Sequence, residues 1–462
     1  MAEQKKYTLS VGITLVIANM IGTGVFTSLG YQVGPLPSGF AILFLWGLGG
    51  VVALCGAFTY AEIASTFNKS GGEYYYLGKI FHPALGFMAG WISLLVGFAG
   101  AISAVAIAIG AYANELTGVP IKVIAVVAII FVSAIHWFGV KAGGTAQNIL
   151  TSLKLVLIAV FCAAPFFVSD ISFSSVNFLP KEGDGSLILS AGFAISLVYV
   201  VYAYTGWNAA SYIAGNLENS EKNLPKSLII GTFTVVAVYL LLNGTFLFVS
   251  DFEELKNQTD IGNVVAFKLF GSKIGSVFAG LFSIALLSTL SAMTIAGPRV
   301  LEAMGQDYPK LQRFTATNKF NMPYIAIIVQ GVWSIFLVMM SEFKVIIQYI
   351  SVSLSFFSML TVIGIFVLRK RMGTGSFRLP LYPLPPIFFI AVTCWMIYFE
   401  FTSNPLVILY SAGTMLSGWL VFKWVASKSN SSAIQKSDNS DIKTPSNDSF
   451  KGDDYVDFEE VK

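Results

Sequence analysis

The chain has 462 residues, of which 55% are hydrophobic and 11% are charged, and its formal net charge is +3. Soluble domains carry about 25% charged residues, so a soluble protein of this length would lack the polar side chains that its surface needs. The composition therefore excludes an ordinary cytosolic enzyme, a disordered chain and a nucleic-acid binder. It predicts a protein that crosses a lipid bilayer many times.

Apolar runs long enough to cross a bilayer recur from residue 9 to residue 426. A transmembrane helix needs about 20 predominantly apolar residues, and helices are expected because lipid offers open backbone groups no hydrogen-bond partner. We therefore expect an all-α polytopic membrane protein whose transmembrane domain covers residues 1–426. Its twelve predicted helices cover residues 9–33, 38–66, 83–115, 121–139, 145–168, 187–216, 225–250, 273–304, 323–340, 343–368, 385–402 and 405–426.

The basic residues predict how these helices are oriented. Lys and Arg are enriched in cytoplasmic loops, and here they concentrate on the side that holds Lys5, Lys6 and residues 369–371. We therefore expect a cell-membrane protein with both termini in the cytoplasm. Residues 427–462 are rich in Ser, Asn, Asp and Lys and predict a disordered cytoplasmic tail. Its acidic end, DDYVDFEEVK, is a candidate for binding a partner.

The first predicted helix contains IANMIGTGVFTSLG, in which Gly22 and Gly24 flank Thr23. Each Gly costs a helix about 1 kcal/mol, so the pair predicts an unwound segment. The N–H groups freed there, together with the helix that begins behind them, form a candidate anion site. The alternative is a surface of small residues that packs against another helix.

The sixth predicted helix is interrupted by the sequence YTGWN, residues 204–208. An aromatic packing cluster would explain this sequence as well. However, interrupted helices at corresponding positions of two halves are a sequence indicator of a transporter's binding site. Halves of five helices each, an odd number, would be inverted relative to each other in the membrane.

Lys154 is the one charged residue that we expect deep in a membrane-spanning helix. It lies nine residues after Thr145, which is about 13 Å along a helix. A Lys at the bilayer centre costs about 2.5–3.5 kcal/mol, so it is a candidate functional residue. The alternative is a structural Lys that binds backbone carbonyls. Ser288 and Thr289, hydroxyl residues of the eighth predicted helix, are candidate partners for it.

Metal and cofactor sites are not expected. Cys55, Cys162 and Cys394 each lie inside an apolar run, with no CxxC or Cys/His spacing. No Asp or Glu is predicted at depth, which argues against a carboxylate-rich metal site and against a membrane-embedded enzyme.

Several segments together resemble the amino acid–polyamine–organocation transporter superfamily, and most closely its L-type amino acid transporter branch. Their order and spacing extend through most of the membrane region. The segments are IGTGVF, AYAEIASTFNKSGGEYYYLG, FMAGW, QNILTSLK, YAYTGWNAASYI with ENSEKNLPKSLI, AGPRVLEAMGQD and FRLPLYPLPP.

The resemblance implies the LeuT-type fold. Two inverted five-helix repeats would cover about residues 9–168 and 187–368, and two further helices would cover 385–426. The substrate's carboxylate would bind the backbone amides of Thr23 and Gly24. Its ammonium would bind backbone carbonyls near Met20, Tyr202 and Thr205.

The remaining positions of the implied site lie in the same two segments. Tyr202 matches the family's gating aromatic residue, which is usually Phe, and its extra hydroxyl would narrow or polarise the pocket. Trp207 and Asn208 match the family's GW-N pair. Gly22, Ala203 and Gly206 are the other residues of these two segments that we expect at the substrate-binding site.

Lys154 matches the lysine that stands, in sodium-independent relatives, where sodium-coupled relatives hold a cation. Its ammonium would link the first break to Ser288 or Thr289, so we expect transport without sodium. Animal relatives bind a heavy subunit through a cysteine in the loop after the third helix. Here that loop, ANELTGVPIK, contains no cysteine, so we expect no covalent heavy subunit.

The sequence thus predicts a secondary transporter of neutral L-amino acids that works by alternating access, either as an exchanger or as a proton symporter. One alternative is a transporter of polyamines or cationic amino acids. For that substrate Tyr202, Tyr204 and Trp207 offer aromatic rings, whereas no acid is expected in the pocket. A second alternative is a transporter-like sensor that signals through its acidic tail.

Overall fold

Almost all of the described chain is helical. The structure is a computed structural model that describes residues 6–67, 69–168, 174–258, 261–340, 343–403 and 405–426. The predicted tail, residues 427–462, lies outside these ranges. In chain order the helices are α1 (Leu9–Met20), α2 (Gly24–Gln32), α3 (Gly39–Phe67), α4 (Glu73–Ile80), α5 (Pro83–Ile92), η1 (Ser93–Phe98), α6 (Ala99–Thr117), α7 (Ile121–Trp137), α8 (Val140–Ala163), η2 (Ala164–Phe166), α9 (Asp184–Ile188), α10 (Ala191–Tyr204), η3 (Ala209–Asn216), α11 (Ser220–Val249), α12 (Phe252–Leu255), α13 (Ile261–Asp307), η4 (Pro309–Thr315), α14 (Tyr324–Met340), α15 (Phe343–Met372), α16 (Leu384–Ser403) and α17 (Pro405–Ala426).

Within the described residues, nine helical segments have the length and apolar composition to cross a membrane. They establish an all-helical, polytopic membrane protein. The segments are Leu9–Gln32, Gly39–Phe67, Pro83–Asn114, Gly143–Phe166, Ser220–Val249, Ile274–Asp307, Ile347–Met372, Leu384–Ser403 and Pro405–Ala426.

The other three predicted helices correspond to shorter or interrupted elements. α7 and α14 have 17 residues each, which is about 26 Å of helix against a hydrocarbon core of about 30 Å. The predicted helix 187–216 is divided into α10, the turn 205–208 and the 3₁₀ helix η3. Each of the three predicted segments is therefore helical over most of its length.

The third predicted helix changes its winding part-way along. α5 begins after His82, whose Nδ1 accepts a hydrogen bond from the Ala84 N–H at 3.1 Å, and Pro83 occupies the first turn. The chain then forms the π-helix η1 over Ser93–Phe98 and continues as α6. A π-turn inserts an extra residue into an α-helix and is frequent at functional sites.

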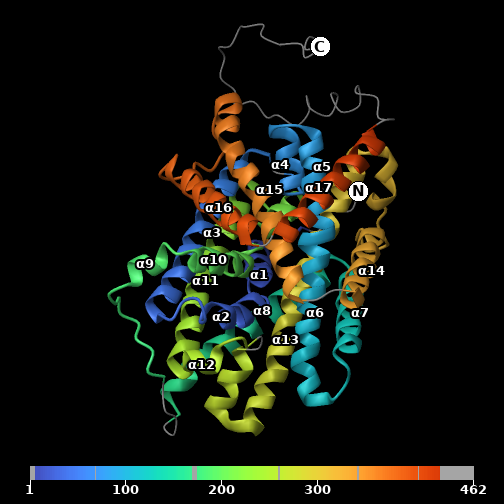
Figure 1. Ribbon diagram of the computed structural model, residues 1–462. Helices are drawn as coiled ribbons and strands as arrows, with labels where there is room; N and C mark the ends of the chain where they lie inside the picture. Colours follow the sequence, from blue (N-terminus) through green and yellow to red (C-terminus); the bar gives the residue numbers. More distant parts are fainter. Residues whose placement is uncertain are drawn as a thin grey trace. The chain divides into compact units, whose positions relative to one another are not determined.

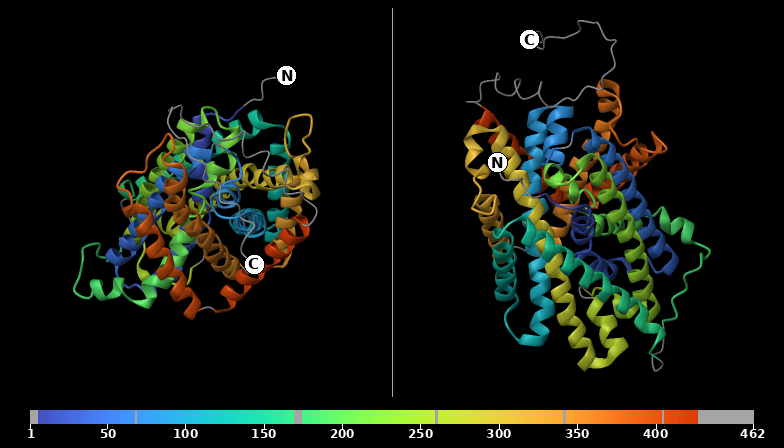
Figure 2. Two further views of the ribbon diagram at one scale, coloured as in Figure 1. Left: turned by 90° about the horizontal axis from the view of Figure 1, so that it is seen from above. Right: turned by 180° about the vertical axis from the view of Figure 1, so that it is seen from behind.

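α1 and α2 lie among the other helices, as Figures 1 and 2 show for the dark-blue part of the chain. Most of their residues are buried. α1 packs against α8, α11 and α13, and α2 packs against α10. A helix that is apolar all round must be covered by protein or by lipid, so these two helices form the centre of the bundle.

The start of α1 is held to the end of η3 by backbone hydrogen bonds. The Tyr7 N–H donates to the Asn216 carbonyl at 2.7 Å, and the Glu218 N–H donates to the Tyr7 carbonyl at 2.9 Å. The two interrupted helices are thus fastened to each other at one end.

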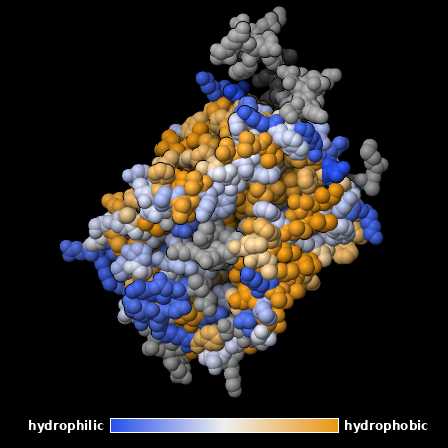
Figure 3. Space-filling model, turned by 45° about the vertical axis from the view of Figure 1, so that its right-hand side comes forward, coloured by the Kyte–Doolittle hydropathy of each residue, from blue (hydrophilic) through white to orange (hydrophobic). Residues whose placement is uncertain are grey.

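Apolar side chains also cover much of the outer surface. Figure 3 shows them gathered over the face that carries α7 and α14. Val127, Phe131, Val332 and Phe336 are among the exposed residues of these two helices. A soluble monomer rarely exposes so continuous an apolar surface, whereas a lipid-facing surface requires one.

Candidate functional site

The first break separates α1 from α2. α1 ends at Met20, α2 begins at Gly24, and residues 21–23 belong to neither helix. The N–H groups in the first turn of α2 have no acceptor within their own helix, and the positive end of the helix dipole adds to them. This end of α2 therefore has the chemistry needed to bind a carboxylate.

The second break follows α10, which ends at Tyr204. The Thr205 N–H and hydroxyl both donate to the Tyr202 carbonyl, at 3.0 and 2.6 Å. Gly206 then turns the chain with φ of +98°, and Asn208 precedes η3. Carbonyls at a helix C-terminus carry partial negative charge, so this break has the chemistry needed to bind a cation.

The two breaks touch each other directly through their glycines. A Cβ on Gly24 would lie 2.6 Å from the Ala203 Cα, and a Cβ on Gly206 would lie 2.8 Å from the Asn19 Cβ. Neither position has room for a side chain, and Gly206 also has a backbone conformation that L-residues rarely adopt. The glycines therefore permit the approach that places an anion-binding and a cation-binding segment side by side.

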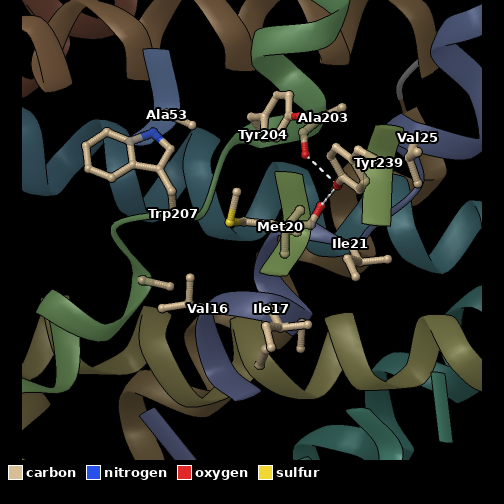
Figure 4. Close-up of a cluster of buried hydrophobic side chains, with 14 of the residues drawn as sticks. Val16, Ile17, Met20, Ile21, Val25, Ala53, Ala203, Tyr204, Trp207 and Tyr239 are labelled. Carbon is tan, nitrogen blue, oxygen red and sulfur yellow. Dashed lines mark hydrogen bonds between the residues drawn. The ribbon is translucent and has the colours of Figure 1, made fainter. Parts of the chain in front are cut away.

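Tyr239 of α11 lies between the breaks and was not predicted from the sequence. Its hydroxyl is within hydrogen-bond distance of the Met20 carbonyl and of the Ala203 carbonyl, the latter at 2.8 Å (Figure 4). A phenol has one proton, so Tyr239 donates to one of these carbonyls at a time. The sequence does contain a sign that could have identified it. Tyr239 and Asn243 are polar residues spaced four apart in an apolar run, so they lie on the same face of a helix.

The three carbonyls predicted to bind an ammonium differ in their hydrogen bonds. The Met20 carbonyl accepts from the Gly22 N–H at 2.8 Å and from Tyr239. The Tyr202 carbonyl accepts twice from Thr205. No described residue donates to the Thr205 carbonyl. An ammonium therefore finds a free acceptor at Thr205, and a second one at Met20 whenever Tyr239 donates to Ala203 instead. At the Tyr202 carbonyl it competes with the two donors of Thr205.

Lys154 of α8 is buried, with 1% of its surface exposed, and it contacts the first break. Its ammonium donates to the Ile21 carbonyl and to the Thr289 hydroxyl, both at 2.6 Å. The Thr289 hydroxyl donates in turn to the Ile21 carbonyl at 2.7 Å. Ser288, the other candidate partner, donates instead to the Ala285 carbonyl of its own helix at 2.9 Å. The ammonium thus links α8, the first break and α13.

Tyr202 uses the hydroxyl that distinguishes it from Phe. Its Oη lies 3.2 Å from the Thr23 Oγ1, so this residue of α10, which we expected at the gating position, is hydrogen-bonded to the first break. The rings of Tyr31 and Tyr199 stack nearby, at 5.2 Å between centroids.

A cavity of about 70 Å³ lies beside the second break. A cavity needs about 10–15 Å³ to hold a water molecule, so this one has room for water beside the break. Its walls include four residues predicted for the site, Thr205, Gly206, Trp207 and Asn208, and also Asn19. The other predicted residues, Met20, Gly22, Thr23, Gly24, Tyr202, Ala203, Lys154, Ser288 and Thr289, do not line it.

Glu73, the first residue of α4, supplies an acid to this cavity. The sequence predicted no acid there, because Glu73 lies between two apolar runs. It is 1% exposed, and its Oε1 accepts from Tyr60 at 2.6 Å, Ser358 at 2.6 Å and Asn208 at 3.0 Å. Burial raises the pKa of the Glu73 carboxyl, while these hydrogen bonds act in the opposite direction.

Two other buried charges belong to ion pairs. Glu62 accepts two hydrogen bonds from Arg369 at 2.7 Å, and Arg299 pairs with Glu302 at 2.6 Å. Lys154 is therefore one of several buried charges. Within the described ranges no three His, Cys, Asp or Glu residues are placed to hold a metal ion.

Comparison with known proteins identifies the family. The profile of the amino acid permease family matches residues 10–422. The serine/threonine exchanger SteT of Bacillus subtilis is 29% identical over an alignment of 407 residues that covers 84% of this chain and 89% of SteT. The human b(0,+)-type amino acid transporter 1 is 26% identical over 434 residues, with 91% and 87% covered.

A third relative is the rat large neutral amino acids transporter small subunit 2. It is 25% identical over an alignment of 442 residues that covers 91% of this chain and 80% of that protein. These matches confirm the resemblance that the sequence motifs indicated. The chain belongs to the amino acid permease family.

Proposed function

We propose that this chain exchanges neutral L-amino acids across the cell membrane by alternating access and without sodium. The contact between the two helix breaks carries the proposal. A zwitterion needs donors for its carboxylate and acceptors for its ammonium a few ångströms apart, and α2 and the end of α10 present these two kinds of group side by side. No side-chain charge is needed to bind the backbone portion of such a substrate.

The names of the relatives agree with this substrate class. One is named an exchanger of serine and threonine, and another a transporter of large neutral amino acids. The name of the first also favours exchange over proton symport for this chain. Apart from Glu73, whose Oε1 already accepts three hydrogen bonds from the protein, the walls of the cavity combine Gly206, Trp207 and Met293 with hydroxyl residues. Such walls suit an uncharged side chain.

We further propose twelve transmembrane helices in the LeuT-type arrangement, with inverted repeats over about residues 9–168 and 187–368 and two further helices over 385–426. The breaks after α1 and α10 lie in the first and sixth predicted helices, which is where two five-helix repeats would place them. The basic loops support cytoplasmic termini. The loop 113–122 contains no cysteine, so we propose no heavy subunit linked by a disulfide at this loop.

Sodium independence is proposed from Lys154. Its ammonium already supplies a positive charge between the Ile21 carbonyl and the Thr289 hydroxyl, two oxygens of the kind that would otherwise bind a cation. A sodium ion at the same position would face electrostatic repulsion from the ammonium.

Proteoliposomes test these proposals together. Vesicles loaded with unlabelled serine are supplied with labelled amino acids, with sodium or choline outside, and with or without a pH gradient. We expect uptake of neutral L-amino acids that requires serine inside and is equal in sodium and choline. Uptake that collapses in choline would refute sodium independence. Uptake driven by a pH gradient into empty vesicles would refute exchange in favour of proton symport.

A further inference from the structure

Another cavity opens at the outer surface of the bundle, between η1, α14, α15 and α17. Its volume of about 710 Å³ is within the range of about 300–1,000 Å³ that is usual for ligand sites. Among the described residues that line it, none belongs to the two helix breaks and none is Asp, Glu, Lys, Arg or His. We call this cavity the α14–α17 groove. Its walls include Val96, Leu337, Ile350, Leu409 and Gly413.

The groove is continuous with the lipid-facing surface of the bundle. Trp333 and Met340 of α14 line it and are 37% and 71% exposed. The exposed Val332 and Phe336 of the same helix belong to the apolar face in Figure 3. Leu409, at the start of α17, is exposed on another part of the rim. An apolar cavity that opens into the hydrocarbon layer is filled by hydrocarbon, because water there lacks the polar partners that it needs.

Three hydroxyl groups of the groove are hydrogen-bonded to protein. The hydroxyls of Tyr349 on α15 and Thr414 on α17 are bonded to each other. The Ser417 hydroxyl accepts a hydrogen bond from the indole N–H of Trp91 at 3.0 Å. These groups need no polar ligand, so the groove suits an alkyl chain that gains from close packing alone.

A basic residue lies at one end of the groove. Lys122 of α7 is exposed, and its ammonium donates to the Met339 carbonyl at 3.0 Å, beside Met340 on the rim. α14 ends at Met340, and the ends of membrane-spanning helices lie close to the lipid headgroups. An ammonium has three donors, so Lys122 can bind a lipid phosphate as well as this carbonyl. Apolar walls with a cation at one end are complementary to an acyl chain and its phosphate.

We propose that the α14–α17 groove binds an acyl chain of one membrane phospholipid, whose phosphate pairs with Lys122. The continuity of the groove with the lipid-facing surface favours a lipid over a second copy of this chain. The inference goes beyond the proposed function, because no substrate and no transport step is needed for the lipid to bind.

The lipid would lie behind one wall of the cavity at the second break. The π-helix η1 contributes to both spaces. Leu95 and Val96 line the groove, whereas Ser93, Gly97 and Phe98 line the cavity beside the break. An acyl chain in the groove therefore packs against the back of the wall that faces the other cavity.

Two pairs of variants test the apolar and the charged part of the site. A Cβ on Gly413 would meet no atom within 4 Å, so Gly413→Phe places a ring in the groove without a backbone clash. Gly244 of α11 has equally open surroundings and does not line the groove, so Gly244→Phe is the matched control. Lys122→Gln removes the charge at the end of the groove. Lys256→Gln removes an exposed charge beside α12, which lies on the other side of the molecule from α14 in Figure 1.

The assay counts bound lipid by native mass spectrometry. Each full-length variant is purified in detergent, stripped of lipid and titrated with dioleoyl phosphatidylglycerol. We expect the wild type to bind one molecule more tightly than any further ones, and Gly413→Phe to lose this molecule while Gly244→Phe keeps it. Lys122→Gln should weaken its binding about fivefold, the usual contribution of one basic residue near an anionic lipid surface, and Lys256→Gln should not. Size-exclusion profiles and melting temperatures establish that each variant is folded.

The outcomes separate a lipid site from the other ways of covering the groove. Equal lipid binding by the wild type and Gly413→Phe would overturn the proposal, and so would an equal loss in Gly244→Phe. A wild-type dimer that Gly413→Phe dissociates, with no difference in bound lipid, would overturn it in favour of a second copy of this chain. None of these measurements requires transport, so the lipid site and the proposed exchange of amino acids can each fail without the other.

Discussion

The hydrogen bonds of Lys154 predict a variant in which the rate of translocation falls more than the affinity for substrate. Replacing Lys154 by Met keeps most of the side-chain volume and removes the ammonium, which donates to the Ile21 carbonyl and the Thr289 hydroxyl at 2.6 Å. Thr289 still donates to Ile21, so that carbonyl keeps one partner. The substitution therefore removes one charge-assisted hydrogen bond at the break without leaving its carbonyl unpaired.

The expected magnitude follows from these contacts. A hydrogen bond to a charged group contributes about 1.5–3 kcal/mol. If this bond must hold α2 as the helices rearrange, a loss of about 2 kcal/mol slows translocation about 30-fold, since each 1.36 kcal/mol is about tenfold in rate. Substrate binding should change less, because Lys154 does not line the cavity. Global stability should change little, because burying the ammonium offsets much of what its bonds contribute.

The assay measures serine exchange at saturating substrate, and serine binding to purified protein. We expect Lys154→Met and Lys154→Ala to lower the exchange rate by a larger factor than they raise the dissociation constant. Thr289→Val should have a similar effect, whereas Ser288→Ala should have a smaller one, because among the described residues the partner of the Ser288 hydroxyl is Ala285 of its own helix. Wild-type exchange by the Lys154 variants would refute this reasoning, and so would a loss of binding as large as the loss of rate.

Three further predictions concern the breaks and the cavity. Gly206→Ala should abolish exchange, because its Cβ would lie 2.8 Å from that of Asn19 at φ of +98°, whereas full activity would contradict the close packing. Tyr239→Phe should lower the melting temperature, since it removes a buried hydrogen bond of about 1 kcal/mol between the breaks; an unchanged melting temperature would show that the bond contributes nothing. Because burial raises the pKa of the Glu73 carboxyl above its ordinary value, this carboxyl gains its proton at a higher pH than an exposed Glu, so the rate of serine exchange should change on mild acidification in the wild type and stay level in Glu73→Gln; identical pH profiles would contradict it.

Residue types with strong local preferences made much of the site predictable. Gly22 and Gly24 weaken a helix wherever they stand, so the first break could be located without tertiary information. Lys154 is costly in a membrane, which limits its surroundings to oxygen acceptors, and the predicted contact with Thr289 is present. Which of the neighbours Ser288 and Thr289 contacts Lys154 depends on how α13 is rotated about its axis. Two adjacent hydroxyl residues in a sequence do not determine that rotation.

Glu73 and Tyr239 were missed because their roles arise from tertiary packing. Hydropathy places Glu73 in a polar connection, yet α4 folds against α15, and Ser358 reaches its carboxylate. Three consecutive tyrosines, residues 74–76, follow Glu73, and so aromatic a connection was a sign that it is buried. Tyr239 looks like an ordinary aromatic residue of a membrane helix until the two breaks are placed on either side of it.

The shape of the cavity depends on the number of residues in the π-helix η1. Ser93, Gly97 and Phe98 of η1 line the cavity, and Ala101 of α6 follows them on the same wall. A π-turn holds one residue more than the α-helical turn that it replaces, so deleting one residue here would restore a regular α-helix and leave α5 and α6 in their present directions. Ala101 would keep its place, whereas the part of the wall formed by Ser93, Gly97 and Phe98 would be rebuilt with one residue fewer. The length of this short stretch therefore sets the shape of one wall of the cavity while the rest of the helix is unchanged.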